Sequence, residues 1–173
     1  FLMKKKVDAF YKTLINGTKD KSEVTSQCIA SLKRMKNLCD KNNVEFQVFF
    51  GSVFAGQMMG YEGDSFYHFL RQVVQTAGDV WCFNTFNDVA MNVYNYYDIA
   101  HYYYEIGDLM IDTMAGKPCK YAGFGVLLNE DNVETEIASR RQHLKEWRAY
   151  YEAHGTLPFQ GMDNSSLIEK IYG

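Results

Sequence analysis

Two runs of β-branched and aromatic residues, 44–50 and 80–83, constrain the fold more than any other feature of the sequence. An amphipathic segment with the length of one helix, 65–76, separates them, and a further helical segment, 22–40, precedes the first run. After the second run, another helix is predicted to end at Met114. Alternation of helix and strand is typical of parallel sheets with crossover helices, so the sequence predicts an α/β fold. The continuous apolar end of 44–50 also predicts burial of that strand on both faces.

The C-terminal part of the chain is predicted to be mostly helical. A long amphipathic helix is expected within 129–153, and its apolar stripe comprises Val133, Ile137, Leu144, Trp147 and Tyr151. Shorter helices are expected at 4–15 and 165–171, and an edge strand or extended loop at 123–128. We therefore divide the chain into an α/β region, 1–128, and a helical C-terminal extension, 129–173, that packs on it.

Charge and composition argue against several classes of function. Lysines and arginines number 18 against 21 aspartates and glutamates, so no basic footprint for a nucleic acid is present. No apolar run approaches the roughly 20 residues that a membrane-spanning helix needs. The four cysteines form no Cys-x-x-Cys motif, and no His-Glu-x-x-His motif or phosphate-binding loop occurs. We expect no metal, no cofactor, no nucleic-acid partner and no membrane span in this chain, and the oligomeric state stays open.

The best candidate for a catalytic acid–base pair is an Asp-x-x-His motif, Asp98 and His101, between the second predicted strand and the following helix. At a helix start, this spacing lets the carboxylate reach the imidazole of the same turn. The carboxylate would hold one ring nitrogen protonated and leave the other as a base. The neighbouring Tyr97 and Tyr102 are candidate substrate-binding residues. From spacing alone, the alternative stays open that Asp98 only caps the helix while His101 lies half-buried in an aromatic patch.

The Asp98-x-x-His101 block is followed by Tyr102 and by Gly-Asp-Leu at 107–109, and it resembles the closing block of the SGNH (GDSL-like) hydrolases. The order of helices and strands over residues 20–116 is similar to the second half of that family, in the variants of cell-envelope and capsule acyl-transfer proteins. The resemblance implies a flavodoxin-like three-layer α/β/α fold with parallel strands. It also implies ester hydrolysis or O-acyl transfer on a carbohydrate by a Ser-His-Asp mechanism, with His101 as base and Asp98 as its orienting carboxylate. A cell-envelope or extracellular location follows from the resemblance, while a cytoplasmic one stays open.

The nucleophilic serine of that family has no clear counterpart. A Gly-Asp-Ser signature occurs at Ser65, but Ser65 lies only thirty-six positions before His101 and beyond a long loop, so we expect it to cap the following helix. Ser52 follows the first strand and is the second possible nucleophile. We expect neither hydroxyl within about 3.2 Å of the His101 ring. Because the chain starts at Phe1 within a predicted helix and shows few strands, we expect it to be a piece of a longer protein that supplies the serine.

Two other functions stay open. In the first, the chain is a non-catalytic carbohydrate-binding or assembly domain, whose Tyr-rich loop stacks on sugars while Asp98 and His101 bind their hydroxyls. In the second, it is a helical interaction module, with 129–153 as the partner-binding face. A serine within hydrogen-bond reach of His101 would distinguish the enzyme hypothesis from the binding-domain hypothesis. The interaction-module hypothesis requires an exposed apolar stripe on the long helix.

Overall fold

The computed structural model describes residues 22–60, 63–98, 100–155 and 158–159. The helices expected at 4–15 and 165–171 lie outside these residues. The described helices are α2 (Ser22–Lys41), α3 (Ala55–Met59), α4 (Asp64–Ala77), α5 (Asp88–Met91), the short 3-10 helix η1 (Val93–Asn95), α6 (Tyr104–Met114) and α7 (Val133–His154). The strands are β1 (Val48–Phe50), β2 (Val80–Cys82) and β3 (Val126–Leu128). None of the described helices is long and apolar enough to span a membrane.

The strands form one three-stranded sheet in the order β1-β2-β3. β1 and β2 are parallel, with Val48 opposite Val80, and α4 connects them, which confirms the predicted α/β unit. β3 pairs antiparallel with β2, so the sheet is mixed and not wholly parallel as predicted. The carbonyl of Gly123 accepts a hydrogen bond from Thr85, which lies just beyond the carboxyl end of β2, so the chain enters β3 from that end.

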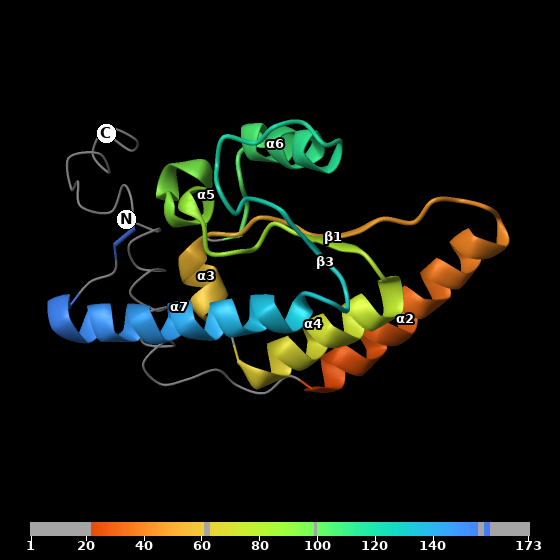
Figure 1. The fold of residues 1–173 in the computed structure, drawn as a ribbon, viewed down its shortest axis with the longest axis horizontal. Coiled ribbons are helices and arrows are strands. Elements are labelled where there is room, and N and C mark those ends of the chain that lie inside the picture. Colours follow the sequence, from red (N-terminus) through yellow and green to blue (C-terminus); the bar gives the residue numbers. More distant parts are fainter. Residues whose placement is uncertain (1–21, 61–62, 99, 156–157, 160–173) are drawn as a thin grey trace.

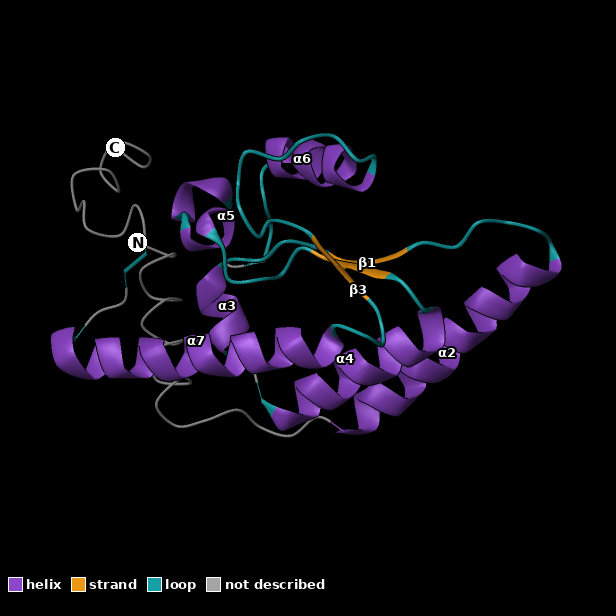
Figure 2. Ribbon diagram, in the orientation of Figure 1, coloured by secondary structure: helices purple, strands orange, loops and turns teal. Residues whose placement is uncertain are grey.

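Helices lie on both sides of this sheet. Figure 1 shows α2, α4 and α7 on one side and α6 on the other, and Figure 2 shows how small the sheet is beside its helices. Short helices lie in the segments that follow two of the strands: α3 follows β1, and α5 and η1 lie between β2 and α6. The protein is therefore a mixed α/β fold dominated by helix.

One side of the sheet forms the main core with α2, α4 and α7. The residues of this core are Ile29, Tyr67, Leu70, Val73, Val74, Val80, Cys82, Leu128, Val133 and Ile137. Val133 and Ile137 of α7 are buried here, and Trp147 is buried further along the same helix. The apolar stripe of the long helix is thus used inside the molecule, which removes the exposed face that the interaction-module hypothesis required.

The opposite side of the sheet is only partly covered. Phe49, Trp81 and Leu127 lie side by side across the three strands. Trp81 packs against a second cluster that includes Ile106 and Met110 of α6, whereas the side chain of Phe49 is 50% exposed. The prediction that the first strand is buried on both faces is wrong, because β1 lies at the edge of the sheet and α6 covers the central strand.

Candidate functional site

Asp98, Ala100 and His101 lie at a turn between two short antiparallel stretches. Tyr96 and Tyr102 form an isolated antiparallel bridge. The backbone N–H of Tyr97 donates to the carbonyl of His101 at 2.8 Å, which closes the turn. Because α6 begins only at Tyr104, Asp98 does not cap that helix and the motif is not on its first turn, contrary to both sequence-based alternatives.

Asp98 accepts hydrogen bonds from its own turn. Its Oδ1 accepts the backbone N–H of Ala100 at 2.8 Å and that of His101 at 2.9 Å. The Nδ1 atom of His101 lies 2.8 Å from Oδ2 and 2.9 Å from Oδ1, so the predicted contact between the two side chains is confirmed.

These contacts also set the charge of Asp98. The hydrogen bond from the backbone of Ala100, followed by those from the side chain and backbone of His101, lowers the pKa of Asp98 to about 2. The carboxylate is therefore ionised at neutral pH and can only accept, so Nδ1 of His101 carries the proton and Nε2 is the basic nitrogen. The His101 side chain is 76% exposed, which rules out the half-buried position considered from spacing.

The two candidate substrate-binding tyrosines lie in different surroundings. Tyr97 is 60% exposed, and its ring centroid lies 3.8 Å from that of Tyr103. Tyr102 is half-buried between the end of β1 and α6. A methyl group added at Gly51 would lie 3.7 Å from the Tyr102 ring, and one added at Gly107 would lie 3.4 Å from it. Tyr97 can therefore contact a ligand with its ring, whereas Tyr102 mainly holds the turn against the sheet.

Ser52 is at the carboxyl end of β1 but is not available to a substrate. Its side chain is buried, and its Oγ lies 2.7 Å from the phenolic oxygen of Tyr96. Burial raises the pKa of Tyr96, against the opposing effect of the hydrogen bond with Ser52. Within the described part of the chain, the hydrogen bonds of the His101 ring go to Asp98. Ser52 therefore anchors the turn from beneath through Tyr96.

Ser65 lies in the first turn of α4. The helix begins at Asp64, so the N-cap position belongs to Gly63, which makes no side-chain capping bond. The prediction that Ser65 caps this helix is wrong, because the helix starts two residues earlier than a cap at Ser65 would require.

A serine–histidine pair lies on α7 but cannot work as a nucleophile and its base. The Oγ of Ser139 is 3.4 Å from Nδ1 of His143, a long distance that makes at most a weak hydrogen bond. The same Nδ1 lies 2.9 Å from the backbone carbonyl of Ser139, which can only accept, so this nitrogen is a donor. It has no lone pair free for the serine proton. Among the described residues, no group of three or more His, Cys, Asp or Glu side chains is placed to hold a metal ion.

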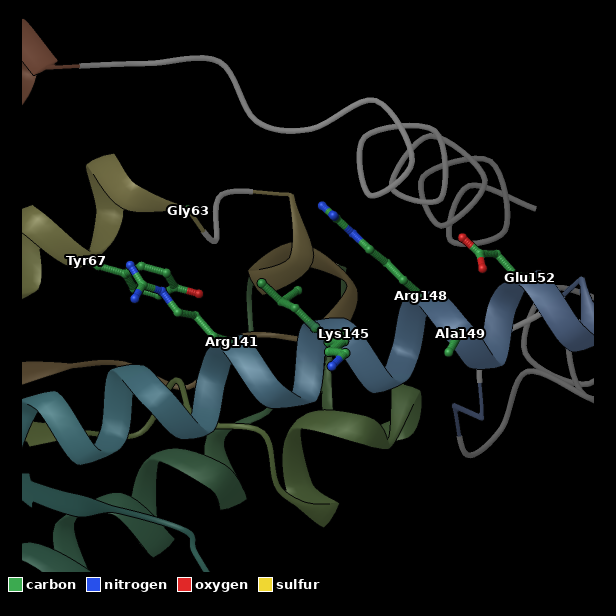
Figure 3. A pocket seen from close by; sticks show the side chains of 8 residues that line it. Gly63, Tyr67, Arg141, Lys145, Arg148, Ala149 and Glu152 are labelled. Carbon is green, nitrogen blue, oxygen red and sulfur yellow. The ribbon is translucent and has the colours of Figure 1, made fainter.

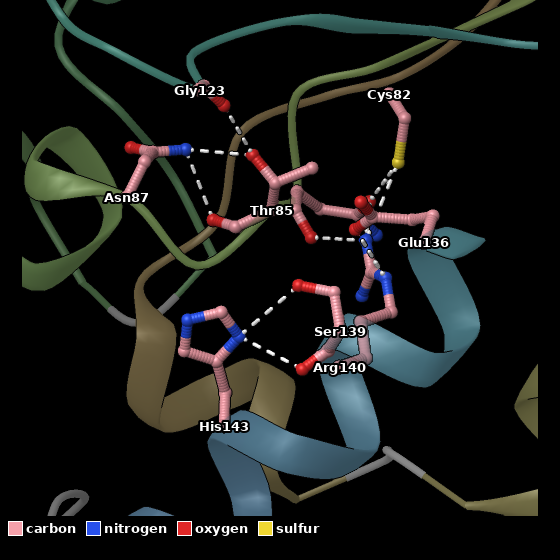
Figure 4. A network of polar contacts seen from close by, with 9 residues as sticks. Cys82, Thr85, Asn87, Gly123, Glu136, Ser139, Arg140 and His143 are labelled. Atoms are coloured by element: carbon pink, nitrogen blue, oxygen red, sulfur yellow. Dashed lines mark hydrogen bonds and ion pairs between the residues drawn. The ribbon is translucent and has the colours of Figure 1, made fainter. Parts of the chain in front are cut away.

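Sequence reasoning missed a buried polar network centred on Arg140 of α7 (Figure 4). The guanidinium is fully buried and donates to Glu136 Oε1 at 2.9 Å and to the backbone carbonyl of Asn84 at 2.7 Å. It also lies 3.3 Å from the sulfur of Cys82. Burial raises the pKa of Glu136, and the neighbouring guanidinium opposes that rise. The network ties α7 to the carboxyl end of β2.

A second part of this network fixes the loop that leads from β2 towards the Asp98–His101 turn. The side-chain amide of Asn87 donates to the backbone carbonyl of Thr85 at 3.0 Å and to its hydroxyl at 2.8 Å. Asn87 also accepts the backbone N–H of Ala90 and caps α5. Buried side chains therefore hold the start of this loop before it reaches the exposed turn.

The sequence did carry a signal for Arg140. Residues of the long helix repeat in alternating steps of four and three at Val133, Ile137, Arg140, Leu144, Trp147 and Tyr151. Arg140 takes a place on this otherwise apolar stripe, and a charge at such a place must be paired when it is buried.

No protein-family model, curated protein or solved structure matches this chain.

Proposed function

We propose that Asp98 and His101 form the base half of a site for ester hydrolysis or O-acyl transfer on a carbohydrate. The observation that carries the proposal is the 2.8 Å contact between Asp98 Oδ2 and His101 Nδ1 on an exposed turn. Backbone N–H groups already hold the carboxylate, so the imidazole is oriented before a substrate binds. An ionised carboxylate on Nδ1 stabilises the imidazolium that forms when Nε2 takes a proton.

The reaction in this proposal follows the serine-nucleophile pattern. His101 Nε2 removes the hydroxyl proton of a serine as its oxygen bonds to the ester carbon, and the proton then passes to the departing alcohol. Water or a sugar hydroxyl attacks the resulting acyl-serine, with His101 again taking and returning the proton. Ser52 is buried, so the proposal places the nucleophile outside the described residues.

The proposal includes the resemblance to SGNH hydrolases and their flavodoxin-like three-layer fold. The parallel pair of β1 and β2, the connecting α4 and the helices on both sides of the sheet support it. The turn with Asp98 and His101 also follows β2 in the chain order that this family uses.

A specific observation favours a second candidate, a non-catalytic carbohydrate-binding site. Tyr97 and Tyr103 form a pair of close rings beside the Asp98–His101 turn, and Tyr94 and Tyr104 nearby in sequence are 39% and 71% exposed. Aromatic rings of this kind stack on the apolar face of a sugar. Asp98 and His101 would then bind sugar hydroxyls without any proton transfer.

Labelling with a fluorophosphonate, combined with acetate release from an acetylated oligosaccharide, separates the two candidates. For the enzyme, we expect labelling at a serine outside the described residues, and the loss of this labelling together with acetate release in His101→Ala. The control His68→Ala changes an exposed histidine on α4 and should keep both signals. Labelling that survives in His101→Ala contradicts the proposed base. Saturable sugar binding that is lost in Tyr97→Ala, without labelling or acetate release, establishes the binding site instead.

A further inference from the structure

A groove separate from the Asp98–His101 turn lies between α7 and the start of α4 (Figure 3). Its volume is about 450 Å³, within the usual range for sites that bind small molecules. Arg141, Lys145 and Arg148 line it from α7, and Tyr67 of α4 and Gly63, just before that helix, also line it. The candidate functions considered above make no use of this groove.

The helical repeat of α7 brings its three cations together. Arg141, Lys145 and Arg148 follow one another in steps of four and three, which places them on one face of the helix. This face borders the buried stripe that contains Leu144, and Leu144 also lines the groove. Long cationic side chains can lay their carbon stems along such an apolar border and keep their charged ends in water.

The charges in the groove are only partly balanced by the protein. Arg141 lies over the ring of Tyr67, 5.1 Å from its centroid, and donates to Asp64 Oδ1 at 2.8 Å. Across the described residues, the ion pairs include neither Lys145 nor Arg148. Glu152 is the acidic residue in the lining and lies one turn beyond Arg148. The three cations are thus accompanied by two carboxylates, those of Asp64 and Glu152, so this region is net positive although the whole chain has a net charge of −3.

We propose that this groove binds a small phosphorylated molecule of sugar-phosphate size. A phosphate monoester carries a charge between about −1.5 and −2 at pH 7, so it adds negative charge to a groove whose lining is net positive. Arg148 supplies the planar set of donors that suits phosphate oxygens, and Lys145 supplies a second positive charge. Leu144 and Ala149 provide apolar surface for the carbon part of the ligand.

Isothermal titration of the full chain at low ionic strength with ribose 5-phosphate tests the proposal. We expect one saturable site, at least tenfold weaker binding of inorganic phosphate, and no binding of ribose. Lys145→Glu and Arg148→Glu should each weaken ribose 5-phosphate binding at least tenfold, because each replaces an attraction by a repulsion. The control Lys33→Glu, at an exposed cation on α2, should leave binding unchanged.

Three results would overturn the proposal. Equal affinity for inorganic phosphate and ribose 5-phosphate would show a simple anion site without specificity for a phosphorylated molecule. Undiminished binding in both groove variants, or an equal loss in Lys33→Glu, would show that the ligand does not use this groove. Absence of saturable binding to the unaltered chain would reject the site. Circular dichroism of each variant confirms that the fold is kept.

Discussion

Arg140 and Asn84 are 56 positions apart in the chain, yet the buried guanidinium donates to the Asn84 carbonyl at 2.7 Å. This bond connects the long helix α7 to the loop that leaves β2. The same guanidinium lies over the rings of Phe66 and Phe86, at 5.5 and 6.0 Å from their centroids. Arg140 therefore connects α7 with α4 and with the loop after β2. This loop leads to the exposed turn that carries Asp98 and His101.

Removal of this guanidinium should destabilise the protein strongly. Arg140→Met leaves the partly buried Glu136 carboxyl and the Asn84 carbonyl without their arginine donor, and a loss of about 3–5 kcal/mol is expected for breaking a buried pair. Arg141→Met, the next residue on the same helix, removes an exposed ion pair and should cost about 0–1 kcal/mol. Urea unfolding monitored by circular dichroism measures both. Equal losses in the two variants would contradict the role given to Arg140.

The stability of the turn should depend on pH through Asp98. The pKa of Asp98 in the folded protein is lowered to about 2, below the usual value near 3.9 for the unfolded chain. The stabilisation is therefore present above about pH 4 and is lost as the pH falls towards 2. Carboxyl ¹³C shifts in an NMR titration report this pKa directly.

The matched variant for this titration is His101→Ala. The pKa of Asp98 should rise when the imidazole is removed but should stay below its usual value, because the hydrogen bond from the backbone of Ala100 is the largest cause of the shift. A return to the usual value in His101→Ala would show that the imidazole, and not the backbone, controls this carboxylate.

Ser52 and Tyr96 should be coupled energetically. Each hydroxyl is the buried partner of the other at 2.7 Å, so Ser52→Ala or Tyr96→Phe leaves one group unsatisfied, at a cost of about 1–3 kcal/mol. The double variant should cost less than the sum of the two, because no hydroxyl is then left without a partner. Denaturant unfolding of the four proteins gives the coupling energy, and the exposed Tyr97→Phe is the control. Strictly additive losses would contradict the buried pair.

His101→Ala should separate activity from stability. The side chain is 76% exposed, so the free energy of unfolding should change by no more than about 0.5 kcal/mol. Any esterase activity should fall by roughly 10³-fold or more, because the proton acceptor is lost. Acetate release and urea unfolding of the same preparation measure both quantities. A large loss of stability would show that His101 holds the turn together and is not a free base.

Local pattern was sufficient for several features. The parallel pair β1 and β2 with its connecting helix follows from the alternation of helix and strand patterns. The end of α6 at Met114 and the contact of Asp98 with His101 follow from residues close in sequence. Three residues of separation bring a carboxylate and an imidazole within reach whether the backbone forms a helix or, as here, a turn. The contact was therefore predictable although its backbone setting was not.

Long-range packing decided the rest. The sequence determined the period of the α7 stripe, but only the folded chain brought Asn84 and Cys82 against the arginine within it. The exposure of Phe49 depends on which strand α6 covers. Ser52 is excluded as a nucleophile because it is buried against Tyr96, which lies 44 positions away in the chain. Periodicity reports which side of an element is apolar, whereas burial and hydrogen bonding depend on the neighbours that distant segments supply.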